Sequence, residues 1–373
     1  MLFSRQDVSQ VKLATAELLI ALNALCPQGG ARIWERVRAA GLLETLQMED
    51  LHRITTSLLR DCVQGKEIDL SALVVQERGQ ALAVGARVLT WVDEEYPERL
   101  KNIAVPPLVL YVRGTTGCLG GPAIAVVGTR SPSEHGRVTA LRLGRQFAQC
   151  GFVVVSGLAL GIDGLAHTGA LEAGGITVGV QGRGLADIYP ASHRGLAARI
   201  VKEGGAIITE FPMQEQPRKE NFPQRNRIIS GVSHGVVVVE AGEKSGALIT
   251  ARFAAEQGRS VYALPGYVTS PAAAGTNRLL MNGAQMILSA EDAVLDLAPQ
   301  LGSGWALPVG GEVELRLSVE EKAILDKLGG LPMSPNELAR CLGLSPEAVL
   351  RVLTVLELGG YVRQDRGGLF ART

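Results

Sequence analysis

The spacing of apolar residues divides the chain into three parts. From residue 1 to about residue 85, apolar residues recur at the interval of an α-helix, and short breaks such as CPQGG at 26–30 separate the helical segments. No segment in this part has the strong pattern of a strand. The pattern predicts a small helical domain, which we assign to residues 1–88.

The pattern changes between about residues 104 and 295, where short β-rich runs alternate with helical stretches. The runs are PPLVLYV, AIAVV, FVVVS, ITVGVQ, AIIT, GVVVVE and VYALP. Several are apolar at every position, which is typical of strands buried on both faces of a parallel sheet. The alternation predicts βαβ units and therefore a doubly wound, Rossmann-like α/β domain, which we assign to residues 89–297.

A stretch rich in glycine and proline, residues 298–311, predicts a linker. Beyond it, three helical patterns begin with capping residues at Ser318, Ser334 and Ser345. The chain then continues as YVRQDR, two glycines and LFART, which is the pattern of a hairpin. Three helices and a hairpin predict a winged helix-turn-helix domain over residues 312–373.

Composition and charge set the limits for a function. The 373 residues suffice for two or three domains, and 46% hydrophobic with 20% charged residues excludes a disordered chain. Because Lys+Arg and Asp+Glu both total 37, the net charge indicates no partner. A site for nucleic acid or phosphate must therefore be a local patch on a neutral protein.

The sequence also bears on compartment and metal content. The start, MLFSRQDVSQ, lacks the features of a signal peptide, and no apolar run approaches the ~20 residues that span a bilayer. The five cysteines are scattered without a C-x-x-C pair, which fits free thiols in a reducing cytoplasm. No His, Cys and carboxylate residues have the spacing of metal ligands. We expect a cytoplasmic protein without a membrane span or a metal.

The segment AIAVVGTRSPSEHGR at 123–137 places an arginine where a buried strand ends. Gly128 permits a sharp turn, and Ser131 or Ser133 can cap the helix that follows. The N–H groups of such a helix attract anions, and the guanidinium of Arg130 matches a phosphate. An ion pair between Arg130 and a neighbouring carboxylate explains the segment equally well. The G-x-G-x-x-G spacing is absent, which disfavours an NAD enzyme.

A second strand ends in SGLALGIDGLAH at 156–167. Gly157 and Gly161 allow a ligand to approach the backbone, and a helix is expected to begin near Ile162–Asp163. The aspartate can act as a general base or as a helix N-cap, and the N-cap is the commoner role. A histidine on such a helix, here His167, is more often packed or solvated than catalytic.

The segment QPRKENFPQRNRIISG at 216–231 carries the densest positive charge of the central part. Four cations surround Phe222, and they are Arg218, Lys219, Arg225 and Arg227. Cations beside an aromatic ring suit a single-stranded nucleic acid, because charges follow phosphates while a ring stacks on a base. The alternative is a solvated loop with Phe222 buried. The loop follows AIIT and should emerge at the same sheet edge as Arg130, which favours the nucleic-acid hypothesis.

Two further segments resemble turns that bind phosphate or carry a catalytic serine. The turn AGEKSGALITARFA at 241–254 again begins a helix with glycine and small hydroxyl residues, although no P-loop motif is present. GVSHG at 231–235 matches the letters of a serine nucleophile turn, but a strand follows where a helix is required. His234 is also the last histidine of the chain. The pattern predicts a binding protein, not an enzyme, and no cofactor.

Several motifs occur in one order across about residues 123–280. They are VVGTR, SGLALGID, GLADIYP, EFP, FPQRNRIISG, VVVVEA, SGALITA, ALPG and GTNRLL. Together they resemble the DNA-processing protein A (DprA/Smf) family, and the pairing of FPxRNRxI with SGxAxGID is specific. The flanking parts are similar to those of three-part members, with an N-terminal domain like a sterile-alpha-motif domain and a C-terminal winged helix.

The resemblance implies a cytoplasmic bacterial protein of natural transformation that binds and protects single-stranded DNA and loads the RecA recombinase. It implies a homodimer through the Rossmann-like domain, near residues 260–287, and no catalytic activity. By motif matching, Arg130 contacts phosphate, Lys219 contacts DNA and Phe222 stacks on a base. The residues expected to bind DNA are Gly128, Thr129, Arg130, Ser156, Gly157, Arg218, Lys219, Phe222, Arg225, Asn226, Arg227, Ser245 and Gly246.

Two departures and one alternative remain. Leu160 stands where many members have an arginine, and Gly246-Ala247 where a bulkier pair is common. The alternative is a nucleotide or nucleoside-monophosphate hydrolase of the lysine-decarboxylase-like group, but EAGEKSGALITA lacks that group's PGGxGT turn.

The winged helix exposes few cations, namely Arg351, Arg363 and Arg366, which favours protein contact or auxiliary DNA binding over sequence-specific recognition.

Overall fold

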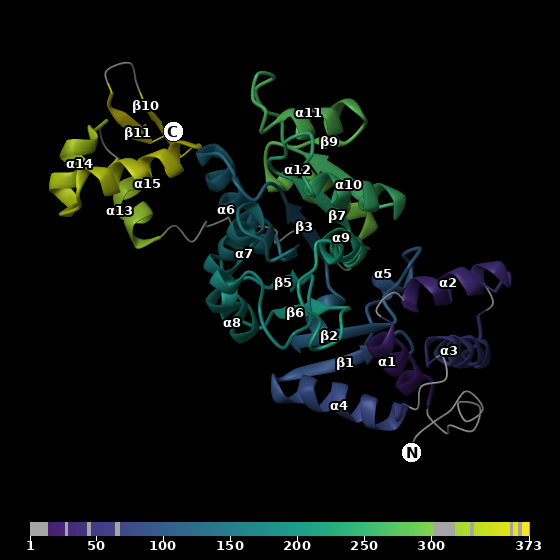
Figure 1. The fold of residues 1–373 in the computed structure, drawn as a ribbon. Coiled ribbons are helices and arrows are strands. Elements are labelled where there is room, and N and C mark those ends of the chain that lie inside the picture. The colour runs from purple at the N-terminus through teal and green to yellow at the C-terminus, as the bar shows by residue number, and fades with distance from the viewer. Residues whose placement is uncertain are drawn as a thin grey trace. The chain divides into compact units, whose positions relative to one another are not determined.

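A computed structural model describes residues 14–26, 29–42, 46–63, 68–301, 318–328, 332–358, 361–364 and 368–372 (Figure 1). The chain divides into two compact units, residues 1–308 and 309–373. The first unit holds the predicted helices and the predicted sheet together, and the second unit is the predicted winged helix.

The N-terminal part is helical, as the apolar spacing predicts. Its helices are α1 Thr15–Leu25, α2 Gly29–Ala39, α3 Met48–Val63 and α4 Leu70–Ala83. Their leucines share one hydrophobic core with the sheet, so that Leu18 and Leu59 belong to the same cluster as Tyr111 and Ile207. The expected boundary after residue 88 falls within a strand, Ala86–Thr90, that joins this sheet.

The sheet has nine strands in the order β1-β2-β6-β5-β4-β3-β7-β8-β9. They are β1 Ala86–Thr90, β2 Val109–Gly114, β3 Ala123–Val127, β4 Val153–Ser156, β5 Thr177–Val180, β6 Ala206–Thr209, β7 Gly235–Val238, β8 Ser260–Ala263 and β9 Gln285–Met286. The seven predicted runs are β2 to β8, and β3 to β9 are parallel. The run PPLVLYV differs from the expectation, since β2 is antiparallel to both of its neighbours.

Helices cover both faces of this sheet. They are α5 Glu98–Lys101, α6 Glu134–Gln149, α7 Ile162–Glu172, α8 Arg194–Lys202, α9 Asn221–Gly231, α10 Ala247–Glu256, α11 Ala274–Met281 and α12 Ala290–Leu297, with short 3₁₀ turns at Thr116–Leu119, Ala191–His193 and Ala298–Gln300. Alternate residues of β3 show the two layers. Ile124 packs with α6, α7 and α12, whereas Ala125 packs with α5, α9 and α10.

One close helix contact sets the position of α7. At Gly169 a Cβ atom would lie 2.1 Å from the carbonyl oxygen of Leu141 on α6, so only glycine allows this approach. The order of the strands also reverses beside α7, because β4 to β6 extend from one side of β3 and β7 to β9 from the other. Ligands of doubly wound sheets bind at this reversal, outside the carboxyl ends of the strands.

The second unit confirms the predicted winged helix. Its elements are α13 Val319–Lys327, α14 Pro335–Leu342, α15 Pro346–Leu358, β10 Val362–Gln364 and β11 Phe370–Arg372. Ser318 and Ser334 form the expected capping boxes with Glu321 and Glu337. Its core joins all three helices to the hairpin through residues such as Leu353. The predicted wing cation Arg366 lies outside the described residues.

Within the described ranges, no helix combines the length and apolar character that a bilayer crossing needs. The same residues contain no group of three or more His, Cys, Asp or Glu side chains arranged to hold a metal ion.

Candidate nucleic-acid interface

A pocket of about 820 Å³ opens at the carboxyl ends of β3 and β7. Five segments line it, namely the turn after β3, the loop into α7 with its first turn, the loop that carries Tyr189, the segment from Lys219 along one face of α9, and the turn before α10 with its first residues. Most residues expected to bind DNA meet here. Those that line the pocket are Gly128, Thr129, Arg130, Lys219, Phe222, Arg225, Asn226, Ser245 and Gly246.

The turn that carries Arg130 is fixed by its neighbours. The Thr129 N–H donates to the carbonyl oxygen of Glu240 at 2.8 Å, and the Thr129 carbonyl accepts from the Ile162 N–H at 3.2 Å. A Cβ at Gly128 would lie 2.6 Å from the Ile162 side chain, which explains the glycine. The turn therefore lies between the end of β7 and the start of α7, and it presents an exposed arginine to the pocket.

The sequence left open whether Arg130 forms an ion pair with a neighbouring carboxylate. No carboxylate within the described ranges forms an ion pair with Arg130. Its guanidinium carbon instead lies 5.5 Å from the centre of the Phe222 ring, in a cation–π contact. The charge of Arg130 is thus available to a ligand.

The N-terminus of α6 is less available to an anion than the sequence suggests. Ser133, one of the two expected caps, accepts from the Gly136 N–H at 3.0 Å. The carboxylate of Glu240 accepts from the Ser133 N–H at 3.0 Å and from its hydroxyl at 2.6 Å. A negative charge already occupies this helix end, so the attraction for phosphate comes from the cations.

The strand end at 156–163 is built from buried polar groups. Ser156 is fully buried and donates to the Val126 carbonyl at 2.6 Å, so its expected contact with DNA does not hold. Asp163 is not the N-cap of α7, which is Gly161. Its carboxylate accepts from the Gly157 N–H at 2.9 Å, and burial raises the pKa of this carboxyl.

Arg225 and His167 are two further buried polar side chains near the end of β4. Arg225 is buried and donates to the carbonyls of Gly157, at 2.7 Å, and of Val180. Burial lowers its pKa to about 10, yet the guanidinium remains charged at neutral pH. His167 is also buried, with its Nδ1 2.6 Å from the Thr177 hydroxyl, and burial lowers its pKa to about 3. This confirms a packed histidine.

The basic segment 216–231 is helical from Asn221 onward, as α9. On a helix, residues three and four apart share a face. Phe222, Arg225 and Asn226 accordingly line the pocket together, and Asn226 donates to the Gly246 carbonyl at 3.3 Å. The exposed Lys219 precedes the helix and completes this side of the pocket.

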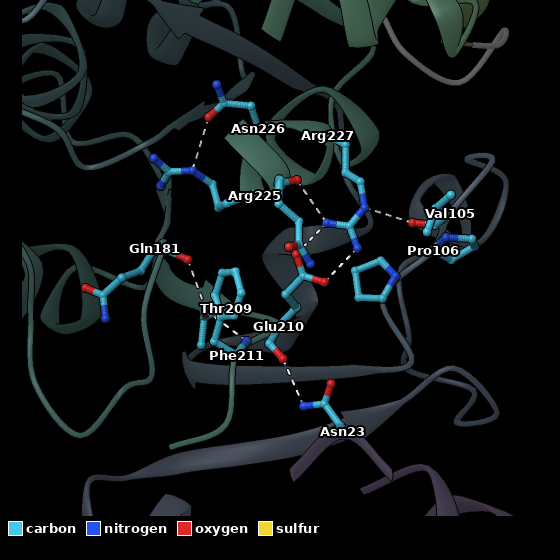
Figure 2. Close-up of polar contacts among 12 residues, drawn as sticks. Asn23, Val105, Pro106, Gln181, Thr209, Glu210, Phe211, Arg225, Asn226 and Arg227 are labelled. Atoms are coloured by element: carbon cyan, nitrogen blue, oxygen red, sulfur yellow. Dashed lines mark hydrogen bonds and ion pairs between the residues drawn. The ribbon is translucent and has the colours of Figure 1, made fainter. Parts of the chain in front are cut away.

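Arg227 does not line the pocket, contrary to the expectation. Figure 2 shows it pointing toward Glu210 instead. It is 8% exposed, and both carboxylate oxygens of Glu210 accept from its guanidinium, one of them at 2.6 Å. Its Nε donates to the Val105 carbonyl at 3.0 Å. The Glu210 carbonyl accepts from Asn23 on α1 at 2.9 Å. Arg227 therefore links α9 to the end of β6 and to the loop before β2.

Arg218 also lies apart from the pocket lining, and its Nε is 3.0 Å from a carboxylate oxygen of Glu215. The lining also contains residues that were not among the expected ones, and a cation and an aromatic ring are among them. Lys244 is exposed directly before Ser245, and Tyr189 belongs to the GLADIYP segment. The motifs containing both residues were recognised, but neither side chain was assigned a role.

Comparison with known proteins agrees with this fold and pocket. The family model described as DNA recombination-mediator protein A matches residues 87–298, and the DprA winged helix domain model matches residues 313–368. Protein Smf of Escherichia coli (strain K12) is 34% identical over 368 residues, which covers 90% of this chain and 94% of that protein. DNA processing protein DprA of Bacillus subtilis (strain 168) is 44% identical over 206 residues, covering 55% and 69%.

Two solved structures are similar to much of this chain. DNA processing protein A from Streptococcus pneumoniae has a TM-score of 0.62 and 32% identity, covering 77% of this chain and 98% of that chain. A structure on the single-stranded DNA binding mode of the Helicobacter pylori protein has a TM-score of 0.52 and 30% identity, covering 58% and 96%. The fold is thus that of a Rossmann-like α/β protein joined to a winged helix. The chain belongs to the DNA recombination-mediator protein A family.

The Arg227–Glu210 pair predicts a large effect on stability. Arg227→Met leaves a buried carboxylate without its partner, which is expected to lower the free energy of unfolding by about 3–5 kcal/mol. Urea unfolding followed by circular dichroism measures it. The matched control is Arg252→Met, whose pair with Glu256 is solvent-exposed on both sides and should cost about 0–1 kcal/mol. Equal midpoints for the two variants would contradict a structural role for Arg227.

Proposed function

We propose that this protein binds and protects single-stranded DNA in the pocket at the carboxyl ends of β3 and β7. One observation carries the proposal. Three exposed cations for which the described residues offer no ion-pair partner, Arg130, Lys219 and Lys244, line one pocket with the half-buried ring of Phe222. The related Helicobacter pylori protein, studied for its single-stranded DNA binding mode, supports the same ligand class.

Each part of the pocket suits one part of an unpaired strand. Cations neutralise backbone phosphates whatever the sequence, and an aromatic ring stacks on a base whose face is free. In a duplex the base faces are covered by their neighbours, so the ring favours a single strand. The N-terminus of α10 at the pocket rim adds a positive dipole end to the same region.

The pocket favours binding over catalysis. The Glu240 carboxylate at the N-terminus of α6 is already engaged by Ser133. Asp163 is held by Gly157 beneath the pocket surface. A nucleotide hydrolase needs a carboxylate free to activate water, and these two acids are committed to holding backbone.

Family membership extends the proposal to loading of RecA during natural transformation. The protein bound to single-stranded DNA would transfer the strand to RecA, and RecA would then form a filament on it. Electron microscopy or RecA ATPase measurements on DNA covered by a single-strand binding protein test this step. Filament formation that is no faster with this protein than without it would refute RecA loading while leaving DNA binding intact.

We also propose that the protein forms a homodimer through the sheet edge at β9. Exposed apolar side chains occur on α11, on β9, in the turn after β9 and on α12, namely Met281, Met286, Leu288 and Leu295, and we call them the apolar patch. Among the described residues, β9 pairs only with β8, so its other edge has no partner strand there. An open strand edge beside exposed apolar side chains favours association with a second copy.

The dimer surface predicts a mass change. Leu288→Glu places a charge within the apolar patch and is expected to shift the protein from dimer to monomer in multi-angle light scattering. Leu82→Glu is the matched control, because Leu82 is exposed on α4 and lies outside the patch. A parent protein that is monomeric at micromolar concentration contradicts the proposed dimer.

The pocket predicts salt-dependent binding of single strands. Arg130→Ala and Lys219→Ala are each expected to weaken binding of labelled oligo-dT. Each should also reduce the slope of log affinity against log salt by about 0.7, because one phosphate contact is lost. Fluorescence anisotropy across a salt series measures both quantities.

The control for this measurement is Arg252→Ala, which removes an exposed arginine of α10 that pairs with Glu256 and does not line the pocket. It should keep the parent affinity and slope. If the pocket variants bind as tightly as Arg252→Ala, the DNA-binding site lies elsewhere. If the parent prefers the duplex, the single-strand proposal fails.

A further inference from the structure

Phe222 has a second aromatic ring beside it. The centre of the Tyr189 ring lies 5.6 Å from that of Phe222, with the two planes inclined by 44°. Tyr189 is 41% exposed, and within the described ranges no hydrogen bond to its hydroxyl is found. Phe222 is more covered, since Gly182 lies against it and the Arg130 guanidinium lies over it. Tyr189 therefore offers the more open aromatic surface.

The two rings line two neighbouring spaces, which also share Arg130 and Arg225 in their linings. The first space is the pocket of about 820 Å³ with Lys219 and Lys244. The second space is a groove of about 50 Å³. The residues that line only the groove are apolar or backbone, and they are Gly157, Leu160, Gly182 and Pro190. Leu160 is 48% exposed, so an apolar side chain faces solvent at the groove.

The loop that carries Tyr189 is held in place by polar contacts. The Tyr189 N–H donates to the Gln181 side-chain oxygen at 3.1 Å, and the Gln181 amide donates to the carbonyls of Gly184 and Asp187 at 3.0 and 2.9 Å. The Asp187 carboxylate accepts two bonds from the Arg194 guanidinium, at 2.9 and 2.8 Å. A ring on a loop fixed in this way loses little freedom when a ligand stacks on it.

We propose that the groove formed by Leu160, Tyr189 and Phe222 is a base-binding subsite in which Tyr189 stacks on the base next to the one on Phe222. This inference rests on the proposed binding of single-stranded DNA. The groove is smaller than a nucleobase, so the base lies across its rim against the Tyr189 ring. Because the two ring planes are inclined by 44°, two bases stacked on them would be inclined to each other, unlike the parallel neighbours in a duplex.

The experiment compares Tyr189→Ala with the full-length parent for binding to labelled oligo-dT. Loss of the ring is expected to weaken binding about tenfold, which corresponds to about 1.4 kcal/mol, with an unchanged salt slope, because no phosphate contact is lost. Tyr189→Phe, which keeps the ring, should restore the affinity. Circular dichroism and the melting temperature check that each variant is folded.

A second oligonucleotide separates a ring–base contact from a merely structural role. Abasic sites in place of the central thymidines should weaken binding by the parent strongly and by Tyr189→Ala much less. An abasic penalty that is equal in both proteins overturns the subsite. So does an unchanged affinity of Tyr189→Ala. If that variant does not fold, photo-cross-linking of the parent to iodouracil-containing DNA decides, with cross-links at Tyr189 supporting the subsite and cross-links confined to other residues overturning it.

These outcomes are distinct from failure of the proposed function. If the parent does not bind oligo-dT, both proposals fall. If the parent binds, and Arg130→Ala but not Tyr189→Ala weakens it, then the phosphate pocket stands and the base subsite does not.

Discussion

The position of α9 is the constraint on which the site depends, and two buried arginines fix it. Arg227 holds the carboxylate of Glu210 at the end of β6 on one side of the helix, and Arg225 holds the carbonyls of Gly157 and Val180 on the other. These anchors join α9 to the ends of β4, β5 and β6. Because both guanidinium groups are committed to the fold, Phe222 and Asn226 are presented to the pocket on a rigid helix.

This arrangement divides the positive charge of the site into two kinds. The buried arginines pair with protein groups, whose desolvation is compensated by hydrogen bonds. The exposed cations Arg130, Lys219 and Lys244 line the pocket and have no such partner within the described ranges. The N-terminus of α6 is less attractive to anions, because the Glu240 carboxylate already binds Ser133 there. The positive charge offered to a polyanion therefore comes mainly from these flexible side chains, which can adjust to the position of a phosphate. The fixed N-terminus of α6 contributes less.

The sequence predicted the parts of the fold that are encoded locally. Strands β2 to β8 are buried runs, so their composition identifies them, whereas β9 consists of two exposed residues and β1 is partly exposed, and each is a strand only because a neighbour pairs with it. The pocket residues next to strand ends were likewise predictable, because parallel strands end at one edge. The burial of Ser156 was not, since it depends on the Val126 carbonyl of another strand.

The misplacement of Arg227 has a geometric cause. A helix turns about 100° per residue, so residues two apart, such as 225 and 227, lie about 200° apart around the axis and cannot face one pocket. A loop carries no such restriction, and the segment was expected to be a loop. In the helix α9, Phe222, Arg225 and Asn226 share one face, whereas Arg227 points away from it. The sequence does not show which group neutralises the charge of Arg227. That partner, Glu210, lies 17 positions earlier at the end of β6, where only the folded chain brings it into contact.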